Sequence, residues 1–515
     1  MIVVQLRRQI FVRQYKLRRI SEMKVLAFDL GASSGRGIIL TYDGNKIDCE
    51  EIYRFRNEPV NLFGHMYWDF PRICREILNG LVCCANSGHG DISAIGIDTW
   101  GVDYGLLDKD GDLLGMIYHY RDVRTNGIEA EIEKKLGMKN IFLMSGIQNI
   151  WFNTSYQLCS MKKFKPEVLA LAKRMMMLPD LIAYFLTGVM KNEYTAAATT
   201  QLYNISERKY DERILRALEL PENIFPDEVI YPGETIGYLK TDIAAMCGLS
   251  QDIPVIASAC HDTASAVTAV PSAADDFIFV SCGTWSLLGT VLDSPILNDA
   301  AYAEGFSNEG MPEGKIKFLK NIMGLWIIQE CRNLWLRRGE KLSFDDLEKA
   351  ASESVPFRSF IDVEDTVFSN PGSMENAIQE YCRVTGQFIP ETKGEIIRCV
   401  YESLAMKYRY SVERLEDLTE KKFEKIYMIG GGCRDNLLCS FTANASGKEV
   451  ISGPAEATAL GNGINQFIGL DVIHSVSEGR EILCRSIDTG CFCPRNTETW
   501  DKAYDRYIRV IGKNN

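Results

Sequence analysis

Two stretches of the chain share one pattern of apolar and polar positions. In residues 25–40 (VLAFDLGASSGRGIIL), an apolar run that contains the acid Asp29 is followed by a small-residue turn and a second apolar run. Residues 277–291 (FIFVSCGTWSLLGTV) repeat this order, with a glycine and hydroxyl residues in the turn. Apolar runs of this length are typical of buried strands, and the small turn between them favours a tight hairpin. The repeat predicts two similar domains, each beginning with the same hairpin.

The rest of the first half predicts a mixed α/β arrangement. Residues 46–55 indicate a third strand, and residues 91–98 indicate a buried strand that ends in Asp98. An amphipathic helix is predicted to open at residues 67–71, because apolar side chains then recur at helical spacing. Residues 128–220 are predicted to be mostly helical. Residues 253–260 predict a buried strand that runs into a helix of small residues.

The second half alternates in a similar way. Residues 318–330 are predicted to open a helix, with the amides of Asn321 and Gln329 on it or at its start. Further helices are predicted over residues 342–355 and 376–418. Residues 425–430 indicate a strand that runs into a triple-glycine turn and then a helix.

At 515 residues the chain is too long for one hydrophobic core. The polar segment PSAADD at residues 271–276 precedes the second hairpin and is the best candidate boundary. We therefore expect an extension over residues 1–22, one domain over 23–270, a second over 271–485, and a C-terminal segment over 486–515.

The first 22 residues contain six basic residues and one acid. A transit peptide or a membrane-surface helix would have this composition, whereas a secretory signal is excluded because a long apolar region is missing. A translation start upstream of the natural one at Met23 fits better, because Met23 directly precedes the first predicted strand. We expect the fold to begin at Met23. The sequence contains no uninterrupted apolar run of roughly 18 residues, so we expect no membrane span and no membrane partner.

Composition narrows the class of protein further. Apolar residues make up 46% and charged residues 24% of the chain, which is typical of a soluble globular protein. The net charge of −12 disfavours binding to nucleic acid. Sixteen cysteines without a C-x-x-C pair, and only five histidines, argue against a transition-metal site and fit a reducing cytoplasm.

Several residues lie where strands end, and each of them has one functional and one purely structural interpretation. The turn after Asp29, with Arg36, fits a cradle for a nucleotide phosphate with a metal nearby, or an ordinary hairpin with a buried acid. Gly101 fits close approach to a ligand, or a tight turn. Asp262 is either a carboxylate that accepts a proton in a cleft or a helix N-cap, and His261 either donates to a ligand or braces the turn.

Three further features of the second half stay open in the same way. Asn321 and Gln329 fit ligand contact or internal capping. The glycines at 430–432 fit a bound base or phosphate, or only a sharp turn. Cys260, Cys282 and Cys433 lie beside these residues, and either make the site sensitive to oxidation or pack inertly.

In combination, the motifs FDLGASSGR, GIDTWGVD, HDTASAV, SCGTWS and IGGGCRDN resemble those of the FGGY sugar-kinase family, over roughly residues 24–470. The resemblance implies two actin-like (ribonuclease H-like) ATPase domains, each with a mixed five-stranded sheet, closing over a central cleft. Within the family, GASSGR, GHMYWDF and HDTASAV are most similar to members that phosphorylate the ketose L-rhamnulose at its 1-hydroxyl.

The resemblance also implies roles for individual residues. Asp262 would be the catalytic base, and Asp29 would hold Mg²⁺, through water. The sugar would be contacted by Gly101, His261, Asp262, Thr263 and Asn321. ATP would be bound by Ala32, Ser33, Ser34, Gly35, Arg36, Thr284, Gln329 and Gly432. The binding partners that the resemblance implies are the sugar and ATP. The oligomeric state that it implies is a monomer or a homodimer. The alternatives are a kinase for another ketose or polyol, such as L-fuculose or xylulose, and a nonenzymatic actin-like nucleotide switch.

Overall fold

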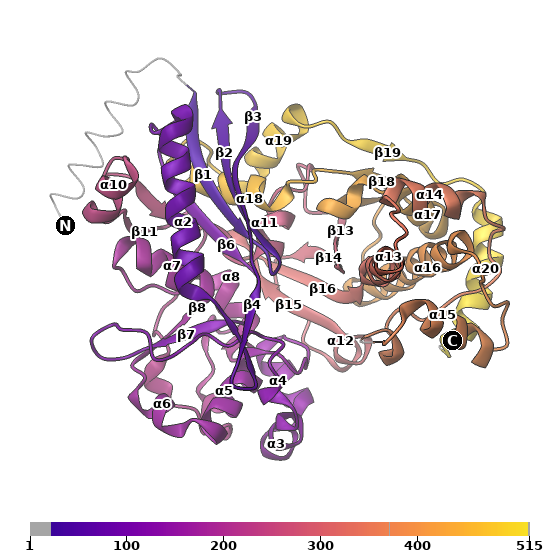
Figure 1. Ribbon diagram of the computed structural model, residues 1–515, viewed down its shortest axis with the longest axis horizontal. Helices are drawn as coiled ribbons and strands as arrows, with labels where there is room; N and C mark the ends of the chain where they lie inside the picture. Colours follow the sequence, from indigo (N-terminus) through magenta and orange to yellow (C-terminus); the bar gives the residue numbers. More distant parts are fainter. Residues whose placement is uncertain (1–21, 370, 513–515) are drawn as a thin grey trace.

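The structure is a computed structural model that describes residues 22–369 and 371–512, so the extension expected before Met23 lies almost wholly outside the described residues. The first half contains a six-stranded sheet in the order β11-β12-β6-β1-β2-β3 (Figure 1). Its strands are β1 (Met23–Leu30), β2 (Ser34–Tyr42), β3 (Ile47–Arg56), β6 (Ile95–Thr99), β11 (Thr235–Tyr238) and β12 (Pro254–Ile256). The predicted first hairpin is β1–β2, and β1 also runs parallel to β6.

Helices cover one face of this sheet, and a subdomain extends from it. The helices α2 (Phe70–Cys84), α7 (Leu178–Thr187) and α10 (Thr241–Cys247) lie on one side of the sheet (Figure 1). The subdomain consists of α3 (Ile128–Lys135), α4 (Met138–Ser145), α5 (Thr154–Phe164), α6 (Pro166–Leu171), α8 (Tyr194–Ala197), α9 (Glu212–Ala217) and the short strands β4 (Pro59–Leu62), β5 (His65–Trp68), β7 (Tyr104–Leu107), β8 (Arg174–Met177), β9 (Tyr203–Asn204) and β10 (Lys209–Tyr210).

The second half contains a seven-stranded sheet in the order β15-β16-β14-β13-β17-β18-β19. The strands are β13 (Ile278–Cys282), β14 (Trp285–Leu292), β15 (Phe306–Gly310), β16 (Ile316–Met323), β17 (Lys425–Ile429), β18 (Glu449–Ser452) and β19 (Gly490–Phe492). The helices are α12 (Asp299–Glu304), α13 (Trp326–Arg337), α14 (Phe344–Glu353), α15 (Met374–Val384), α16 (Lys393–Thr419), α17 (Asn436–Ser446), α19 (Val476–Ser486) and α20 (Thr497–Val510).

Five strands of the two sheets correspond one to one. The series β3-β2-β1-β6-β12 has the same order and strand directions as β16-β14-β13-β17-β18. The duplicated fold with a mixed sheet in each half is therefore confirmed. The observed sheets are larger than the predicted five strands, because β11, β15 and β19 add to their edges.

Two helices pack between the sheets and join the halves (Figure 1). α11 (Asp262–Thr268) follows the last strand of the first sheet, whereas α18 (Ala457–Gly469) comes from the second half yet lies against β1 and β6. Gln466 on α18 donates a hydrogen bond to the Leu26 carbonyl on β1 (3.1 Å). A Cβ added at Gly461 would lie 1.8 Å from the Ser265 carbonyl oxygen, so α11 and α18 are in backbone contact.

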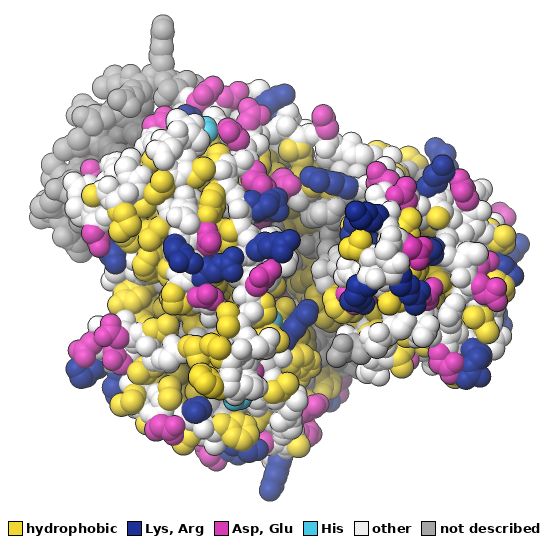
Figure 2. All heavy atoms as spheres, viewed as in Figure 1, with side chains coloured by type: hydrophobic (Ala, Val, Ile, Leu, Met, Phe, Trp, Pro, Cys, Tyr) yellow, Lys and Arg dark blue, Asp and Glu magenta, His cyan; other side chains and the backbone are white. Residues whose placement is uncertain are grey.

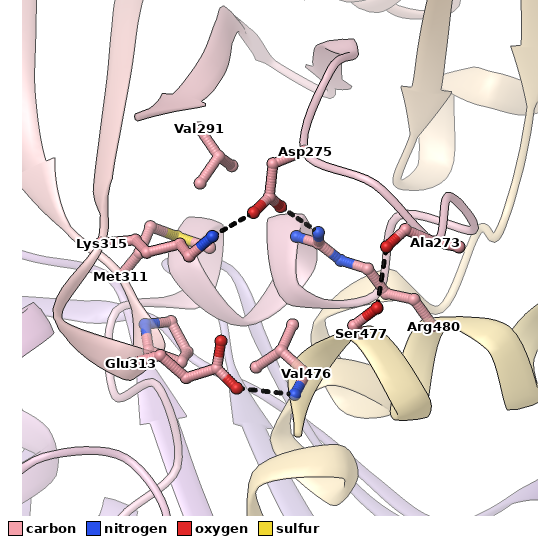
Figure 3. Close-up of a pocket in the computed structure, with 10 residues that line it drawn as sticks. Ala273, Asp275, Val291, Met311, Glu313, Lys315, Val476, Ser477 and Arg480 are labelled. Carbon is pink, nitrogen blue, oxygen red and sulfur yellow. Dashed lines mark hydrogen bonds and ion pairs between the residues drawn. The ribbon is translucent and has the colours of Figure 1, made fainter. Parts of the chain in front are cut away.

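Two basic side chains hold the segment between the halves. Asp275 lies between Lys315 and Arg480 and pairs with both (Figure 3). Arg480 also donates to the carbonyls of Val267 and Thr268 at the end of α11, each at 3.1 Å. The connection is therefore tied to α19 and to the β15–β16 turn. The division of the chain at residue 271, and the separate segment from residue 486, stay predictions.

Three local predictions were wrong. Residues 316–323 form strand β16 and not the start of a helix, because β14 and β15 pair with it on both sides and an apolar run fits either structure. α13 begins only at Trp326. Tyr67 lies in β5, and α2 begins at Phe70 with Asp69 as its N-cap. Asp262 is the first residue of α11 and not its N-cap, the position that His261 takes.

Candidate active site

A cleft of about 410 Å³ lies between the halves. Figure 2 shows the molecular surface hollowed between the two halves. The five residues expected to contact a sugar, which are far apart in the sequence, all line this cleft: Gly101, His261, Asp262, Thr263 and Asn321. Asn321 reaches it from β16 of the second half, and the other four come from loops and the α11 start in the first half. The structure therefore brings together the predicted sugar-contacting set.

Asp262 is placed by the end of a buried strand and the first turn of α11. Its side chain is one-third exposed, and its Oδ1 accepts a hydrogen bond from the Thr263 hydroxyl at 3.1 Å. Since its carboxylate is not used to cap the helix, it is free to meet a ligand in the cleft. This arrangement can accept a proton from a bound hydroxyl group.

One wall of the cleft is aromatic and is held by a buried acid. Trp100 and Tyr120 line the cleft, and Trp68 packs against Trp100 with ring centroids 4.2 Å apart and the ring planes tilted by 37°. Asp103 accepts hydrogen bonds from both indoles, at 2.6 Å from Trp68 and 2.8 Å from Trp100, and a third from Gln157 at 3.0 Å. Asp103 therefore fixes the orientation of the wall.

Two strand-end acids lie side by side close enough to Asp262 to interact with its charge. Asp29 on β1 and Asp98 on β6 are paired in register across the parallel strands. Burial raises the pKa of both carboxyl groups. Repulsion from Asp29 adds to the shift of Asp98, which is large, whereas the ion pair with Arg36 opposes the shift of Asp29. Asn462 donates a hydrogen bond to Oδ2 of Asp98 at 2.6 Å. The other carboxylate oxygen of Asp98, Oδ1, is buried and has no hydrogen-bond partner among the described residues. The sequence analysis placed Asp98 at the end of a strand but assigned it no role. Its position at a strand end, like that of Asp29, was the signal that could have identified it.

The first hairpin turn does not line the cleft. Arg36 bridges two carboxylates, those of Asp29 and of Glu456 at the start of α18. Gly35 is buried, and a Cβ there would lie 2.2 Å from the Phe55 ring, so this glycine is required for packing. Three further residues of this turn that were expected to bind ATP are exposed or partly buried: Ala32, Ser33 and Ser34. Arg36 thus connects the turn to the second half.

The second hairpin turn is anchored to α13. The Thr284 hydroxyl donates to Oε1 of Gln329 at 3.2 Å, and the Leu325 amide donates to the Gly283 carbonyl at 3.0 Å. In the triple-glycine turn, Gly432 packs on Cys282, where a Cβ would lie 2.5 Å from the sulfur. Gly431 instead has open space around it and lines the cleft. The family resemblance points to Gly432, whereas Gly430 and Gly431 line the cleft, because the sequence pattern does not tell which of three glycines faces outward.

The cysteines near the cleft favour the packing interpretation. Cys260, Cys282 and Cys433 are buried, and burial raises the pKa of the Cys282 thiol to about 12 and that of Cys433 to about 11. Burial also raises the pKa of Cys260 well above its usual value. Thiols of this kind are poor nucleophiles at neutral pH.

We expect alkylation of the native protein with iodoacetamide at neutral pH to modify the exposed Cys493 and to leave these three thiols unmodified, because the thiolate is the reacting species. Peptide mapping of modified protein measures this result, and the denatured protein is the control in which all sixteen cysteines should react. Modification of Cys282 in native protein at the rate of Cys493 would contradict the burial argument.

The duplicated sheets and the cleft between them define an actin-like two-domain kinase fold. A gluconate kinase from Lactobacillus acidophilus has a similar structure, with a TM-score of 0.79 over 96% of this chain and 98% of that chain, at 16% identity. The FGGY family of carbohydrate kinases matches with its N-terminal domain over residues 24–269 and with its C-terminal domain over residues 278–470.

The chain belongs to this family, and it is a phosphotransferase that acts on a sugar hydroxyl. It is 42% identical over 485 residues to a rhamnulokinase from Bacteroides thetaiotaomicron, covering 94% of this chain and 99% of that protein. It is also 42% identical over 463 residues to a rhamnulokinase from Halalkalibacterium halodurans, covering 90% and 97%.

Proposed function

We propose that this chain transfers the γ-phosphate of ATP to the 1-hydroxyl of L-rhamnulose, giving L-rhamnulose 1-phosphate and ADP in L-rhamnose catabolism. The observation that carries the proposal is the likeness to rhamnulokinases over nearly the full length of the chain, with Asp262 at the cleft between the halves. The sixteen free cysteines support a reducing, cytoplasmic setting.

In this proposal Asp262 is the catalytic base. Phosphoryl transfer depends mainly on positioning the two substrates in line and on neutralising charge. Asp262 takes the proton from the attacking sugar hydroxyl as the O–P bond forms, while Gly101, Thr263 and Asn321 hold the sugar. The nucleotide lies toward the second half, against the Thr284 turn and Gly431, with residues 32–36, Gln329 and Gly432 supporting its site.

The acids beside the cleft fit a divalent cation. Asp98 has a buried carboxylate oxygen without a hydrogen-bond partner among the described residues, and a cation would relieve its repulsion from Asp29. Residues 22–369 and 371–512 contain no group of three or more potential ligands placed to hold a metal on their own, which suits Mg²⁺ that keeps water and phosphate ligands. Asp29 and Asp98 would hold it, and Mg²⁺ would supply charge neutralisation for the phosphates.

ADP release from MgATP across a panel of ketoses and polyols tests the proposal. We expect turnover that depends on L-rhamnulose and exceeds that with L-fuculose, xylulose or glycerol. Turnover with another sugar of the panel would keep the enzyme class and change the substrate. ATP hydrolysis that no sugar stimulates would favour the nucleotide switch and reject the kinase.

The aromatic wall predicts a pH dependence of sugar binding. Burial raises the pKa of Asp103 to about 6, so the carboxyl group is ionised above this pH and protonated below it. A protonated carboxyl group has an O–H that must face one of the surrounding N–H donors, which disturbs Trp68 and Trp100. We expect the KM for the sugar to rise as the pH falls through about 6.

Initial rates over about pH 5 to 8 measure this effect. Asp103→Asn is the matched variant, because it keeps the shape but does not titrate. We expect it to raise KM by roughly 10-fold at every pH, the scale of one mismatched buried hydrogen bond, and to remove the acid rise. An acid rise that persists in Asp103→Asn would assign the titration to another group.

A further inference from the structure

A buried ion pair of the second half contacts His261. Lys317 on β16 and Glu309 on β15 are paired in register, and Lys317 Nζ lies 2.7 Å from Glu309 Oε2. Lys317 is fully buried and Glu309 is nearly so. Lys317 Nζ also lies 2.9 Å from His261 Nδ1, and Glu309 Oε2 lies 3.4 Å from the same nitrogen. The proposed catalytic machinery described above does not use this pair.

The charge states within the cluster are mutually consistent. Burial alone would raise the pKa of Glu309, but the charge of the adjacent Lys317 ammonium outweighs burial and holds this pKa below its usual range. Glu309 is therefore a carboxylate and matches the ammonium opposite it. A lone buried ammonium or carboxylate would be strongly unfavourable, which explains why the two occur together.

The chemistry of the donor decides the tautomer of the histidine. An ammonium group has only donors, so His261 Nδ1 must be the acceptor in its contact with Lys317. A neutral imidazole carries its single proton on one nitrogen, which places the proton on Nε2. Nε2 lies 3.5 Å from Asp262 Oδ1, and both residues line the cleft.

We propose that Lys317 and Glu309 are positioning residues that hold His261 as the Nε2–H tautomer, with this N–H directed toward the Asp262 carboxylate and the sugar. The inference rests on the proposed function and adds to it a pair that no local sequence pattern marked. Because the pair lies on the second half and Asp262 on the first, the geometry of the base then depends on both halves being in place.

The tautomer can be observed directly in the full-length, ligand-free protein. Long-range ¹H–¹⁵N spectra of protein labelled at its five histidines distinguish a protonated from an unprotonated ring nitrogen, and His261→Gln assigns the signal. We expect His261 in the wild type to show a protonated Nε2 and an unprotonated Nδ1. A protonated Nδ1 in the wild type would overturn the proposal. This measurement needs no substrate, so its failure is distinct from failure of the proposed function.

Variants test the effect of the pair on catalysis. Lys317→Met combined with Glu309→Gln removes the donor without leaving a buried carboxylate unpaired. We expect the double variant to lose the single His261 tautomer and to lower kcat roughly 10-fold, with the KM for ATP unchanged. Lys317→Arg keeps a donor to Nδ1 and should retain the wild-type tautomer and most of kcat.

Lys320→Met is the matched control. Lys320 is a buried lysine on the same strand, paired with Glu364 at 3.7 Å and so directed to other partners. We expect it to leave the His261 signal unchanged even if it lowers stability. An unchanged tautomer and unchanged kcat in the Lys317→Met/Glu309→Gln protein would overturn the proposal, as would an equal change of the His261 signal in Lys320→Met.

Discussion

Asp262→Asn is expected to lower kcat by at least ~10²-fold and as much as ~10⁴-fold, the range for loss of a general base. The asparagine keeps the shape of the side chain and can still accept from the Thr263 hydroxyl, but it cannot take the proton of the sugar hydroxyl. Because the proton moves only as the O–P bond forms, the KM for ATP should change little. ADP release measured with saturating L-rhamnulose tests both statements.

A matched control separates this effect from a general effect on helix ends. α10, like α11, has seven residues, and Asp242 lies exposed in its first turn, away from the cleft. Asp242→Asn removes the same charge from the first turn of a helix of the same length and should leave kcat at the wild-type value. An Asp262→Asn enzyme as fast as the Asp242→Asn enzyme would exclude Asp262 as the base.

The second large effect is expected on stability. Gly461→Ala places a Cβ 1.8 Å from the Ser265 carbonyl oxygen, a clash of backbone with side chain that no rotamer change relieves. Overpacking of this kind costs about 1–3 kcal/mol or more, and it outweighs the ~1 kcal/mol that alanine adds to helix propensity. Since α11 and α18 join the two halves, the melting temperature should fall by several degrees.

Gly431→Ala provides the comparison. A Cβ there meets nothing within 4 Å, and the backbone of Gly431 is outside the left-handed region. Thermal unfolding followed by circular dichroism should therefore give a melting temperature close to the wild-type value for Gly431→Ala and a lower one for Gly461→Ala. Equal melting temperatures for the two variants would mean that α11 and α18 can separate without cost.

The sequence by itself determined the two hairpins and the acids at the strand ends. These features depend on residues close together in the chain: an apolar run, a small turn and a second apolar run can bury themselves in few ways. The position of Asp262 at a strand-to-helix junction followed from the same local pattern. The motif combination then indicated the family, and through it the duplicated fold and the sugar-contacting set that lines the cleft.

Only the tertiary structure decided which partners meet across the molecule. Asn321 lies on β16 and not on a helix, because pairing with β14 and β15 determines the conformation of an apolar run that fits both. The contacts of Arg36 with Glu456 and of Lys317 with His261 join residues 420 and 56 positions apart in the chain. Such contacts leave no local periodicity, since they depend on how the two sheets and the helices between them pack.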